Sequence, residues 1–481
     1  MTPRPFFLAL DQGSHASKAM VFDPAGHVVA AAERPVATRS PEPGRVEHLA
    51  EEVIASLQEA ITEVVAACPG VELAEAGLAI QRSSVVCWDR QSGAALSPVL
   101  SWQDRRNAAW LEQQAFDAAQ LREITGLVAS PHYGASKLRW CLDNLDEVRQ
   151  ARSSGRLCCG PLASFVLHRL LAERPCLVDP ANASRTLLWN VRSHDWSASM
   201  LAACGVPRDC LPRCVPSRHR FGTLGTAAGA VPCTVATGDQ SAALFARGRP
   251  AADRVFVNIG TGAFVQRVLG GTPPDAPGLL RSVAWLDGQG TLGVLEGTVN
   301  GAGAALRWLA DARGVELQDL LDGADRWLAE FDGATLFLNG VGGLGAPYWA
   351  SGCPVAFSKP AGLAAETAAV LESIAFLLAV NVAAVGAAGD VPAKGIVISG
   401  GLARLEGLCQ RLADLSGLPV ERPADIEATA HGLACLLGSA PAADTAPAAL
   451  YRPQPDAALR QRFERWRAWL ESMLVDGAPR A

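Results

Sequence analysis

Short apolar runs broken by glycine turns mark both halves of the chain. The run at 6–10 ends in Asp11-Gln12-Gly13-Ser14, and a second, mostly apolar run follows at 18–22. The same arrangement recurs around Gly260-Thr261-Gly262 in the second half. Each pattern predicts a β-hairpin. Backbone N–H groups of such turns bind phosphate oxygens, so the pair indicates two related domains that close on one polyphosphate.

Longer segments with helical spacing alternate with these strands. Residues 6–34 alternate like a three-stranded meander, and apolar residues at 49, 53, 57, 61 and 64 predict a helix over 48–67. We further expect strands at 77–80, 85–88, 336–338 and 396–398, and helices at 136–149, 161–172, 301–312, 364–388, 402–416 and 455–475, the last packed on the surface. The order of strands and helices repeats in the two halves and predicts an α/β layered fold.

Length and composition narrow the class of protein. A chain of 481 residues is too long for a single core, and a stretch with Gly and Pro at 247–253 separates two apolar blocks. We therefore predict domains at 1–248 and 249–481. The net charge of −6 provides no basic field for nucleic acid, so no nucleic-acid partner is expected.

The sequence also favours a cytoplasmic protein without a membrane partner. The apolar stretch at 361–388 is interrupted by Glu366 and Glu372, short of the ~20 apolar residues that a span needs. The N-terminus leads directly into a strand and offers no signal-peptide pattern. Thirteen cysteines are scattered without CxxC spacing, which is typical of reduced thiols.

Two aspartates follow predicted strands. Asp11 stands before the first turn, where its carboxylate could hold Mg²⁺ through water while the turn holds phosphate; it could equally cap its own hairpin. Asp239, in Gly238-Asp239-Gln240, lies between a strand and a helix. It is either an ordinary helix N-cap or a general base that takes a proton from a substrate hydroxyl during phosphoryl transfer.

Polar clusters after two other apolar runs suit a small hydroxylated ligand. Gln81-Arg82-Ser83-Ser84 follows the strand at 77–80, and Trp102 begins the cluster at 102–106. Open α/β sheets bind ligands at the carboxyl ends of their strands. Arg82 would supply a fork of donors and Trp102 an apolar wall, although core packing accounts for Trp102 equally well. Arg105-Arg106 is interpreted as a solvated helix start.

Two nucleotide-binding motifs are not supported. No GxxxxGK[ST] occurs, so a P-loop is excluded. Residues 340–345 satisfy GxGxxG, but Ala346-Pro347 follows where a dinucleotide site needs a helix. A glycine-rich loop near a cleft is the better interpretation.

The chain resembles the FGGY carbohydrate kinases, and among them it is most similar to glycerol kinases. The resemblance covers roughly residues 6–440 and rests on LALDQGSHASKAMVFD, WQDRR, SKLRW-CLDN, NASRT, GDQSAALF, GTGAF, GGLGAPYW and VERPADIEAT, in the order of the family. It implies two actin-like (ribonuclease H-like) domains that flank a central nucleotide and substrate cleft. It also implies ATP with Mg²⁺ as the phosphoryl donor.

The resemblance assigns roles to individual residues. The catalytic base falls on Asp239, and the metal site on Asp11 with Asp239. Substrate positions fall on Arg82, Ser83, Trp102, His132, Asp239, Gln240 and Phe264. Nucleotide positions fall on Ser14, His15, Lys18, Gly260, Thr261, Gly303, Arg307, Gly400 and Gly401.

Some positions depart from the family pattern. Ser83 stands where glycerol kinases carry Glu, and His132 stands where they carry Tyr; both positions contact glycerol in that family. On the nucleotide side, the replaced positions are His15, Lys18, Arg307, Ser399 and Leu405.

We therefore expect an ATP-dependent kinase for a small polyol or sugar, with glycerol as the default substrate. A kinase for a longer polyol or a ketose, such as a tetritol or ketopentose, is the first alternative. A nucleotide-binding regulator with weak kinase activity is the second, and homo-oligomerisation is left open.

Overall fold

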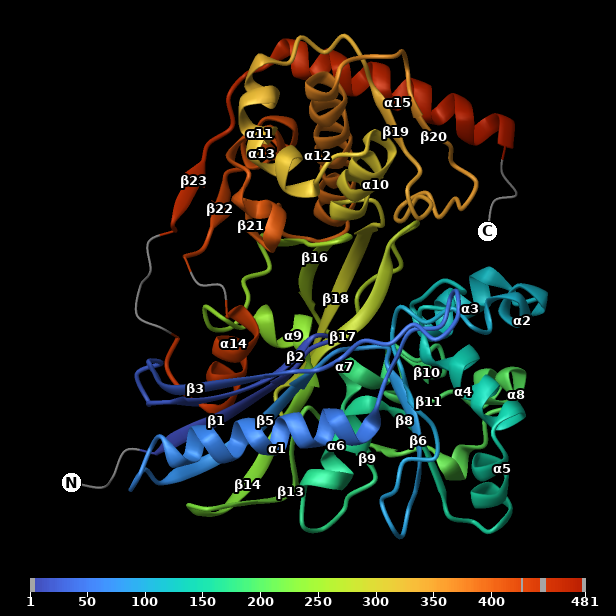
Figure 1. Cartoon of the computed structure of the whole chain (residues 1–481), viewed down its shortest axis with the longest axis vertical. Helices are drawn as coiled ribbons and strands as arrows, with labels where there is room; N and C mark the ends of the chain where they lie inside the picture. The colour runs from blue at the N-terminus through green and yellow to red at the C-terminus, as the bar shows by residue number, and fades with distance from the viewer. Residues whose placement is uncertain (1–4, 425–426, 442–446, 478–481) are drawn as a thin grey trace.

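Two large β-sheets form the frame of the molecule, one in each half (Figure 1). The computed structural model describes residues 5–424, 427–441 and 447–477. The first sheet has the strand order β13-β14-β5-β1-β2-β3. Its strands are β1 Phe6–Gln12, β2 Ala16–Phe22, β3 Val28–Pro35, β5 Leu73–Ile80, β13 Arg218–Thr226 and β14 Gly229–Gly238.

The first sheet confirms the predicted meander and adds a parallel core. Strands β1, β2 and β3 are successive antiparallel neighbours. Strand β5 runs parallel to β1 on one side and to β14 on the other. The carboxyl ends of these three strands consequently lie together at one edge of the sheet.

Helices cover both faces of this sheet, and one of them comes from the far end of the chain. Helix α1 (Ala50–Ala66) packs on β2 and β3, and α6 (Leu162–Leu170) lies beside it. On the other face, α14 (Ala428–Leu437) packs on β1 and β5 and against α9 (Asp239–Ala243). The boundary at residue 248 stays a prediction; α14 lies beyond it in sequence yet belongs spatially to the first sheet (Figure 1).

A smaller sheet and a group of short helices extend the first half. The sheet has the order β4-β7-β6-β8. Its strands are β4 Glu47–His48, β6 Val85–Asp89, β7 Val99–Leu100 and β8 Leu157–Pro161. The accompanying elements are α2 Ala108–Gln113, α3 Ala118–Thr125, α4 Gly134–Asn144, α5 Asp146–Ser153, β9 Leu177–Val178, α7 Pro180–Ala183, β10 Trp189–Asn190, β11 Asp195–Trp196, α8 Ala198–Cys204, η1 Arg208–Cys210 and β12 Arg213–Cys214.

Two predicted helices are interrupted in the structure. The helix expected at 136–149 is split into α4 and α5 because Leu145 takes an extended backbone, with φ −106° and ψ 117°. The helix expected at 402–416 is a 3₁₀ turn, η2 (Gly401–Arg404), followed by α13 (Glu406–Ser416), and Leu405 between them is again extended. Apolar spacing alone does not reveal a single extended residue inside a helical stretch.

The second sheet repeats the hairpin-plus-parallel-strand arrangement. Its order is β17-β18-β16-β15-β21-β22-β23, with β15 and β16 antiparallel and β21 parallel to β15. Its strands are β15 Arg254–Ile259, β16 Ala263–Gly270, β17 Leu280–Asp287, β18 Gly290–Val299, β21 Gly395–Ser399, β22 Val420–Arg422 and β23 Ala449–Tyr451. Around it lie α10 Gly303–Arg313, α11 Leu317–Glu330, β19 Phe337–Asn339, β20 Val355–Phe357, α12 Leu363–Ala387 and α15 Ala457–Gly477.

Helix α12 is the centre of the second core. It is the single helix of the described residues that is long and apolar enough to cross a membrane, but 83% of its most apolar window is buried inside the protein. Its buried Glu372 accepts hydrogen bonds from Arg411 (3.0 Å) and Arg462 (2.6 Å). Burial together with these partners identifies α12 as a core helix.

The C-terminal helix α15 lies along the outside of the second half, as expected for a surface helix (Figure 1). One face nevertheless enters the core, where Leu459, Trp466 and Leu470 are buried. Arg462 on the same helix reaches Glu372 of α12. The helix therefore closes the second core as well as covering it.

An apolar cluster joins the two halves. It contains Phe7 and Val235 from the first sheet, Trp285 and Val294 from the second, and Leu433 from α14. Residues of both sheets and of α14 pack against one another in this cluster. The cluster therefore fixes the position of one half of the molecule relative to the other.

We predict that Gly432→Ala destabilises this junction. A Cβ at Gly432 would lie 1.8 Å from the carbonyl oxygen of Ala242 in α9, so α14 would have to move. We expect a loss of about 1–3 kcal/mol in the free energy of unfolding, measured by urea denaturation. Gly386→Ala in α12 is the matched control, since a Cβ there meets no atom within 4 Å and should leave stability unchanged or raised. Equal stability of the two variants would contradict the tight α9–α14 contact.

Candidate active site

The strand ends of the first sheet bring together three predicted site residues. Asp11 lies near the end of β1, Arg82 follows β5, and Asp239 follows β14 as the first residue of α9. The last residues of these three strands are in register with one another. The predicted cluster at the carboxyl ends of parallel strands is therefore present.

A buried ion cluster connects this edge to the second sheet. Arg82 donates through Nη2 to Gln240 Oε1 and, at 3.3 Å, to Glu296 Oε2 of β18. Arg185 Nη1 lies 3.0 Å from Glu296 Oε1, and Gln266 Nε2 of β16 donates to Oε2 at 2.8 Å. Arg82 is thus anchored from both halves of the molecule.

The cluster keeps its charges although it is buried. Burial alone would raise the pKa of Glu296, but the guanidinium groups of Arg185 and Arg82 hold it below its ordinary value. Among the described residues, Arg82 Nη1 and Arg185 Nε find no hydrogen-bond acceptor. Buried donors of this kind normally have a partner, so a ligand with several oxygens fits beside them.

The carboxyl groups of Asp11 and Asp239 both have raised pKa values. Burial first, and the negative charge of Asp239 second, raise the pKa of Asp11 to about 7. Burial also raises the pKa of Asp239, although Arg82 and a 2.7 Å hydrogen bond from the backbone N–H of Gln240 act against the rise. The N-cap of α9 is Gly238, and Asp239 is the first residue of the helix.

This carboxylate pair fits a divalent cation, which would remove the repulsion between the two groups. Within the described residues, no three or more His, Cys, Asp or Glu side chains form a metal cluster. The other ligands of such an ion would be water and phosphate oxygens, which is the usual way in which proteins bind Mg²⁺.

Three predicted substrate positions, Ser83, Trp102 and His132, lie side by side, and this group is called the predicted wall below. The Trp102 and His132 rings lie 5.5 Å apart, and Trp102 Nε1 donates to Ser14 Oγ at 3.0 Å. Trp102 is half-buried and ties the wall to the first turn, so it is not simply a core residue. The backbone of Ser83 has φ 65°, and its buried Oγ has no hydrogen-bond partner among the described residues.

His132 contributes to this wall as a neutral ring. Burial, followed by the charges of Arg185 and Lys137, lowers its pKa well below the ordinary value. Lys137 Nζ donates to the carbonyl oxygens of Ser83 (3.0 Å), Ser101 (2.8 Å) and His132 (2.8 Å). This one ammonium group fixes the backbone on both sides of the wall.

The interpretation of Arg105-Arg106 was half wrong. Arg105 is exposed as expected, but the Arg106 side chain is only 3% exposed, donates to Asp104 and Glu47, and lies 4.6 Å from the Trp140 ring. An arginine with two carboxylate partners and an aromatic face is a packing element, and local sequence shows none of these partners.

The first turn is tied to its surroundings by side chains. Ser14 Oγ donates to Gln81 Oε1 at 3.3 Å. Lys18, directly opposite Asp11 on β2, donates to both carboxylate oxygens of Glu427 at 2.7 and 2.9 Å. His15 is exposed at the tip of the turn.

The second turn packs on the start of α10 and on the glycine pair after β21. The N–H of Gly303 donates to the Gly260 carbonyl at 3.0 Å, and a Cβ at Gly303 would lie 2.8 Å from that oxygen. Gly400 has φ 94°, and a Cβ there would lie 2.5 Å from the carbonyl of Ile259. Thr261 thus stands where a hairpin turn meets the N-terminus of a helix, an arrangement that favours phosphate.

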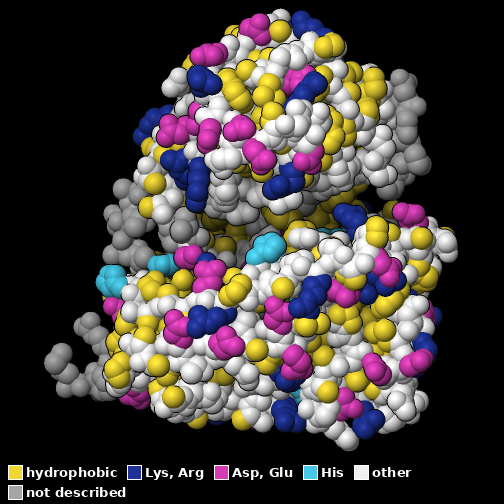
Figure 2. Space-filling model, viewed as in Figure 1, with side chains coloured by type: hydrophobic (Ala, Val, Ile, Leu, Met, Phe, Trp, Pro, Cys, Tyr) yellow, Lys and Arg dark blue, Asp and Glu magenta, His cyan; other side chains and the backbone are white. Residues whose placement is uncertain are grey.

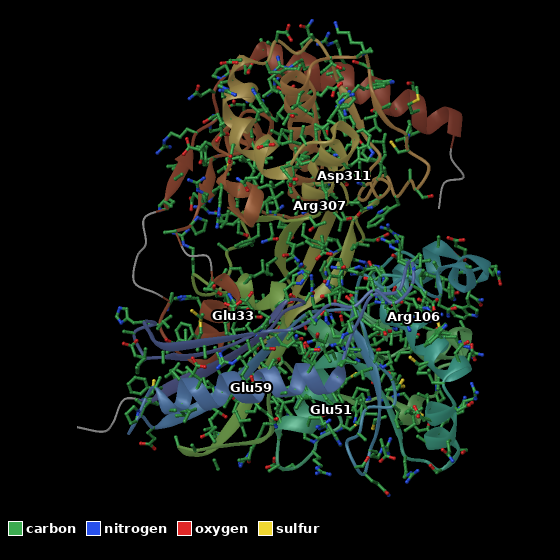
Figure 3. The ribbon with its side chains drawn as sticks, in the orientation of Figure 1. Glu33, Glu51, Glu59, Arg106, Arg307 and Asp311 are labelled. Atoms are coloured by element: carbon green, nitrogen blue, oxygen red, sulfur yellow. The ribbon has the colours of Figure 1, made fainter. Side chains whose placement is uncertain are left out.

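The surface is hollowed between the two halves (Figure 2). Arg307 is an exposed residue of α10, and Figure 3 places it on the side of that helix nearest the first half. Leu405, by contrast, is buried in the second core. Phe264 lies on β16 two residues before Gln266, so both side chains are on the same face of the sheet.

Comparison with known proteins identifies the family. The model of the N-terminal domain of the FGGY family of carbohydrate kinases matches residues 6–246, and that of the C-terminal domain matches residues 255–440. The chain belongs to this family. It is 35% identical to the glycerol kinase of Citrifermentans bemidjiense over 96% of this chain and 97% of that protein. It is also 35% identical to the glycerol kinase of Bordetella parapertussis, over 92% of this chain and 89% of that protein.

Solved structures show the same fold. The Plasmodium falciparum glycerol kinase with ADP superposes with a TM-score of 0.88 at 21% identity, covering 98% of this chain and 99% of that chain. The xylulose kinase of Rhodospirillum rubrum gives a TM-score of 0.84 at 20% identity, covering 97% and 99%. The kinase therefore has the two actin-like α/β domains that the sequence predicted, and membership of this family implies ATP as its phosphoryl donor.

Several residues that contact the predicted site positions or their partners have no role in the sequence prediction: Lys137, Arg185, Gln266, Glu296 and Glu427. Glu296 carries a local signal, because it is an acidic residue within the largely apolar strand 290–299, and a carboxylate in that setting is almost always paired. Lys137, Arg185 and Glu427 lie within the family motifs SKLRW, NASRT and VERPADIEAT. Gln266 has no local signal, because its partner Glu296 comes from another strand.

We predict that Asp11→Asn changes how the stability of the ligand-free kinase depends on pH. Because the folded-state pKa of Asp11 is raised from 3.8 to about 7, the group is protonated in both states below pH 3.8. Between pH 3.8 and pH 7 only the unfolded state ionises, so the group destabilises the fold increasingly, and the cost is complete above pH 7. The gain in unfolding free energy of the variant over the wild type should therefore grow from near zero at about pH 4 to about 2–4 kcal/mol at about pH 8.

Urea denaturation in buffer with a chelator measures this difference. The control is Asp311→Asn, which removes an exposed carboxylate from α10 (Figure 3). If Asp11→Asn and Asp311→Asn show the same pH dependence, Asp11 is not the strained carboxylate described here.

Proposed function

We propose that this kinase transfers the γ-phosphoryl group of ATP to a hydroxyl of a small polyol or sugar, with Asp239 as the general base. The proposal rests above all on the position of Asp239. This partly buried carboxylate lies at the carboxyl end of β14 beside Asp11 and Arg82, and its pKa is raised. An aspartate whose pKa is raised from its ordinary acidic value is a better general base for a reaction at neutral pH.

The acceptor would bind between Arg82, Gln240 and the wall of Trp102, with Phe264 closing the pocket from the second sheet. The unpartnered Nη1 of Arg82 is free to donate to a hydroxyl oxygen. Because Glu296 and Gln240 already hold the other side of the guanidinium, its orientation is set before the acceptor arrives. Such preorganisation lowers the entropic cost of orienting the hydroxyl toward Asp239.

Asp239 would then accept the hydroxyl proton as the oxygen attacks the γ-phosphorus. The desolvated site keeps bulk water from competing with the acceptor. Asp11 and Asp239 would hold Mg²⁺, which when bound neutralises charge on the phosphate oxygens. Lys18, held opposite Asp11 by Glu427, adds a positive charge on the same turn.

The nucleotide would lie across the two turns. The phosphates would contact the first turn from one half and the second turn with the start of α10 from the other. The adenosine end would extend past α10 and the glycine pair after β21. The residues proposed for these contacts are Ser14, His15, Lys18, Gly260, Thr261, Gly303, Arg307, Gly400 and Gly401.

The choice of acceptor is the finer part of the proposal. Ser83 and His132 replace the Glu and Tyr of glycerol kinases, so the pocket has lost a carboxylate and gained space. Ser83 Oγ is buried without a partner, and His132 is neutral. A longer polyol or ketose would supply oxygens to these groups, whereas glycerol is too short to reach all of them. We propose that glycerol is accepted weakly and that a longer chain is preferred.

Replacing Asp239 with Asn should reduce turnover by ~10²-fold or more, because the amide cannot take up the hydroxyl proton. ATP binding, measured by calorimetry, should persist because the substitution is isosteric. Asp319→Asn, which also removes an acidic residue from the first turn of a helix, serves as the control and should keep full activity. Near-normal turnover of Asp239→Asn would refute the assignment.

A panel of acceptors with ATP tests the choice of substrate. Losing two hydrogen-bond partners should raise the KM for glycerol by roughly ten- to a few-hundredfold relative to a pocket with Glu and Tyr. We expect a lower KM for some tetritol or ketopentose. The double change Ser83→Glu with His132→Tyr should shift the preference toward glycerol, and each single change should do so in part.

Two results would contradict this proposal at different levels. A micromolar KM for glycerol, below that of every longer polyol, would mean that Ser83 and His132 are neutral replacements in a glycerol kinase. Phosphorylation of no member of the panel would remove the small polyols and sugars as acceptors altogether.

A further inference from the structure

Two cysteines outside the active site lie in direct contact. The Sγ atoms of Cys158 and Cys176 are 3.1 Å apart, although both residues are free thiols. Cys158 lies on β8, where it pairs with Trp88 of β6. Cys176 directly precedes β9, and helix α6 lies between the two cysteines in sequence. The sulfur atoms need to approach by only about 1 Å to reach the length of a disulfide bond.

The surroundings of this pair favour a thiolate. The guanidinium of Arg90 is held beside β8 by the carbonyls of Asp209 (2.8 Å) and Leu157 (3.4 Å), and it reaches the sulfur of Cys158. The hydrogen bond from Cys176 first, and Arg90 second, lower the pKa of Cys158 to about 7. Cys158 therefore loses its proton near neutral pH, whereas the pKa of Cys176 is raised and this thiol keeps its proton.

Access to solvent separates this pair from another sulfur cluster nearby. Cys87, Cys141 and Cys159 also lie close together, but all three are fully buried. Cys176 is partly exposed. Cys158 itself is buried, so an oxidant would reach the pair from the side of Cys176. A thiolate with a cationic neighbour and a partner thiol open to solvent is the type that reacts with oxidants.

We propose that Cys158 and Cys176 form a redox-active dithiol that a hydroperoxide converts into an intramolecular disulfide. The Cys158 thiolate attacks one peroxide oxygen, the O–O bond breaks, and the leaving oxygen takes up a proton to depart as water or an alcohol. Cys158 is then a sulfenic acid. Cys176 attacks its sulfur, the S–O bond breaks, and the hydroxide leaves as water with the proton from Cys176. Two thiols are oxidised and one peroxide is reduced.

The disulfide would brace the first half of the molecule. It would close the segment 158–176, which contains α6, and would fasten β8 to the strand that leads into α7 and Arg185. Closing a loop of this size restricts the unfolded chain. We therefore expect oxidation to raise the melting temperature of the first half by about 5 °C.

Hydrogen peroxide treatment of the full chain, followed by alkylation and tryptic peptide mass analysis, tests the proposal. Cleavage after Arg156, Arg169 and Arg185 places Cys158 and Cys159 in one peptide and Cys176 in another. The expected product is a pair of these peptides joined with the loss of two hydrogens. A reductant should separate them and reverse the rise in melting temperature.

Serine variants identify the atoms involved. Cys159→Ser is the matched control, since Cys159 follows Cys158 on the same strand and its side chain points to the opposite face. The cross-link should form in the wild type and in Cys159→Ser, and should be absent from Cys158→Ser and Cys176→Ser. Melting of the untreated variants shows whether each is folded. A cross-link that persists in Cys158→Ser, or oxidation of Cys158 or Cys176 to sulfinic acid without any cross-link, would overturn the proposal.

Discussion

The buried contact between Arg82, Glu296 and Arg185 is the constraint on which the site depends. Glu296 belongs to the second sheet, whereas both arginines belong to the first half of the chain. Removing one member of such a cluster leaves an uncompensated buried charge and typically costs about 3–5 kcal/mol. The cluster therefore fixes the second sheet against the edge where β1, β5 and β14 end, and it orients Arg82 at the same time.

The active-site electrostatics follow from this arrangement. Asp11 and Asp239 lie at the edge of the first sheet, where they are partly buried. Burial raises the pKa of both carboxyl groups, and the charge of Asp239 raises that of Asp11 further. The same desolvation that makes these groups unfavourable in the empty site makes them responsive to a cation and to a substrate proton. Stability and the proposed chemistry are thus opposed at these two residues.

The proposed acceptor pocket combines a rigid framework with an altered lining. Its framework is rigid, because one buried Lys137 holds three backbone carbonyls around the wall. Ser83 and His132 are the positions at which we expect its lining to depart from the glycerol kinases. In the proposed function, a rigid frame with an altered lining would change which acceptor oxygens are bound without moving the site of phosphoryl transfer.

Local patterns in the sequence were sufficient to predict many of the secondary-structure elements of this kinase and the positions of several site residues. The two glycine hairpins, the order of strands and helices, and the strand-end positions of Asp11, Arg82 and Asp239 follow from apolar periodicity and turn residues, and the structure confirms them. Resemblance to the FGGY family supplied the domain fold. These features are local or are carried by contiguous motifs, so a single sequence contains them.

Tertiary structure decided the rest. Glu296 meets Arg82 across 214 positions of sequence, and Lys18 meets Glu427 across 409. Helix α14 leaves the second half and packs on the first sheet, and Arg106 is buried by Asp104, Glu47 and Trp140 rather than solvated. The raised pKa of Asp11 and the contact between Cys158 and Cys176 arise in the same way. Burial and charge pairing depend on which distant segments meet, and the spacing of residues along one segment does not contain that information.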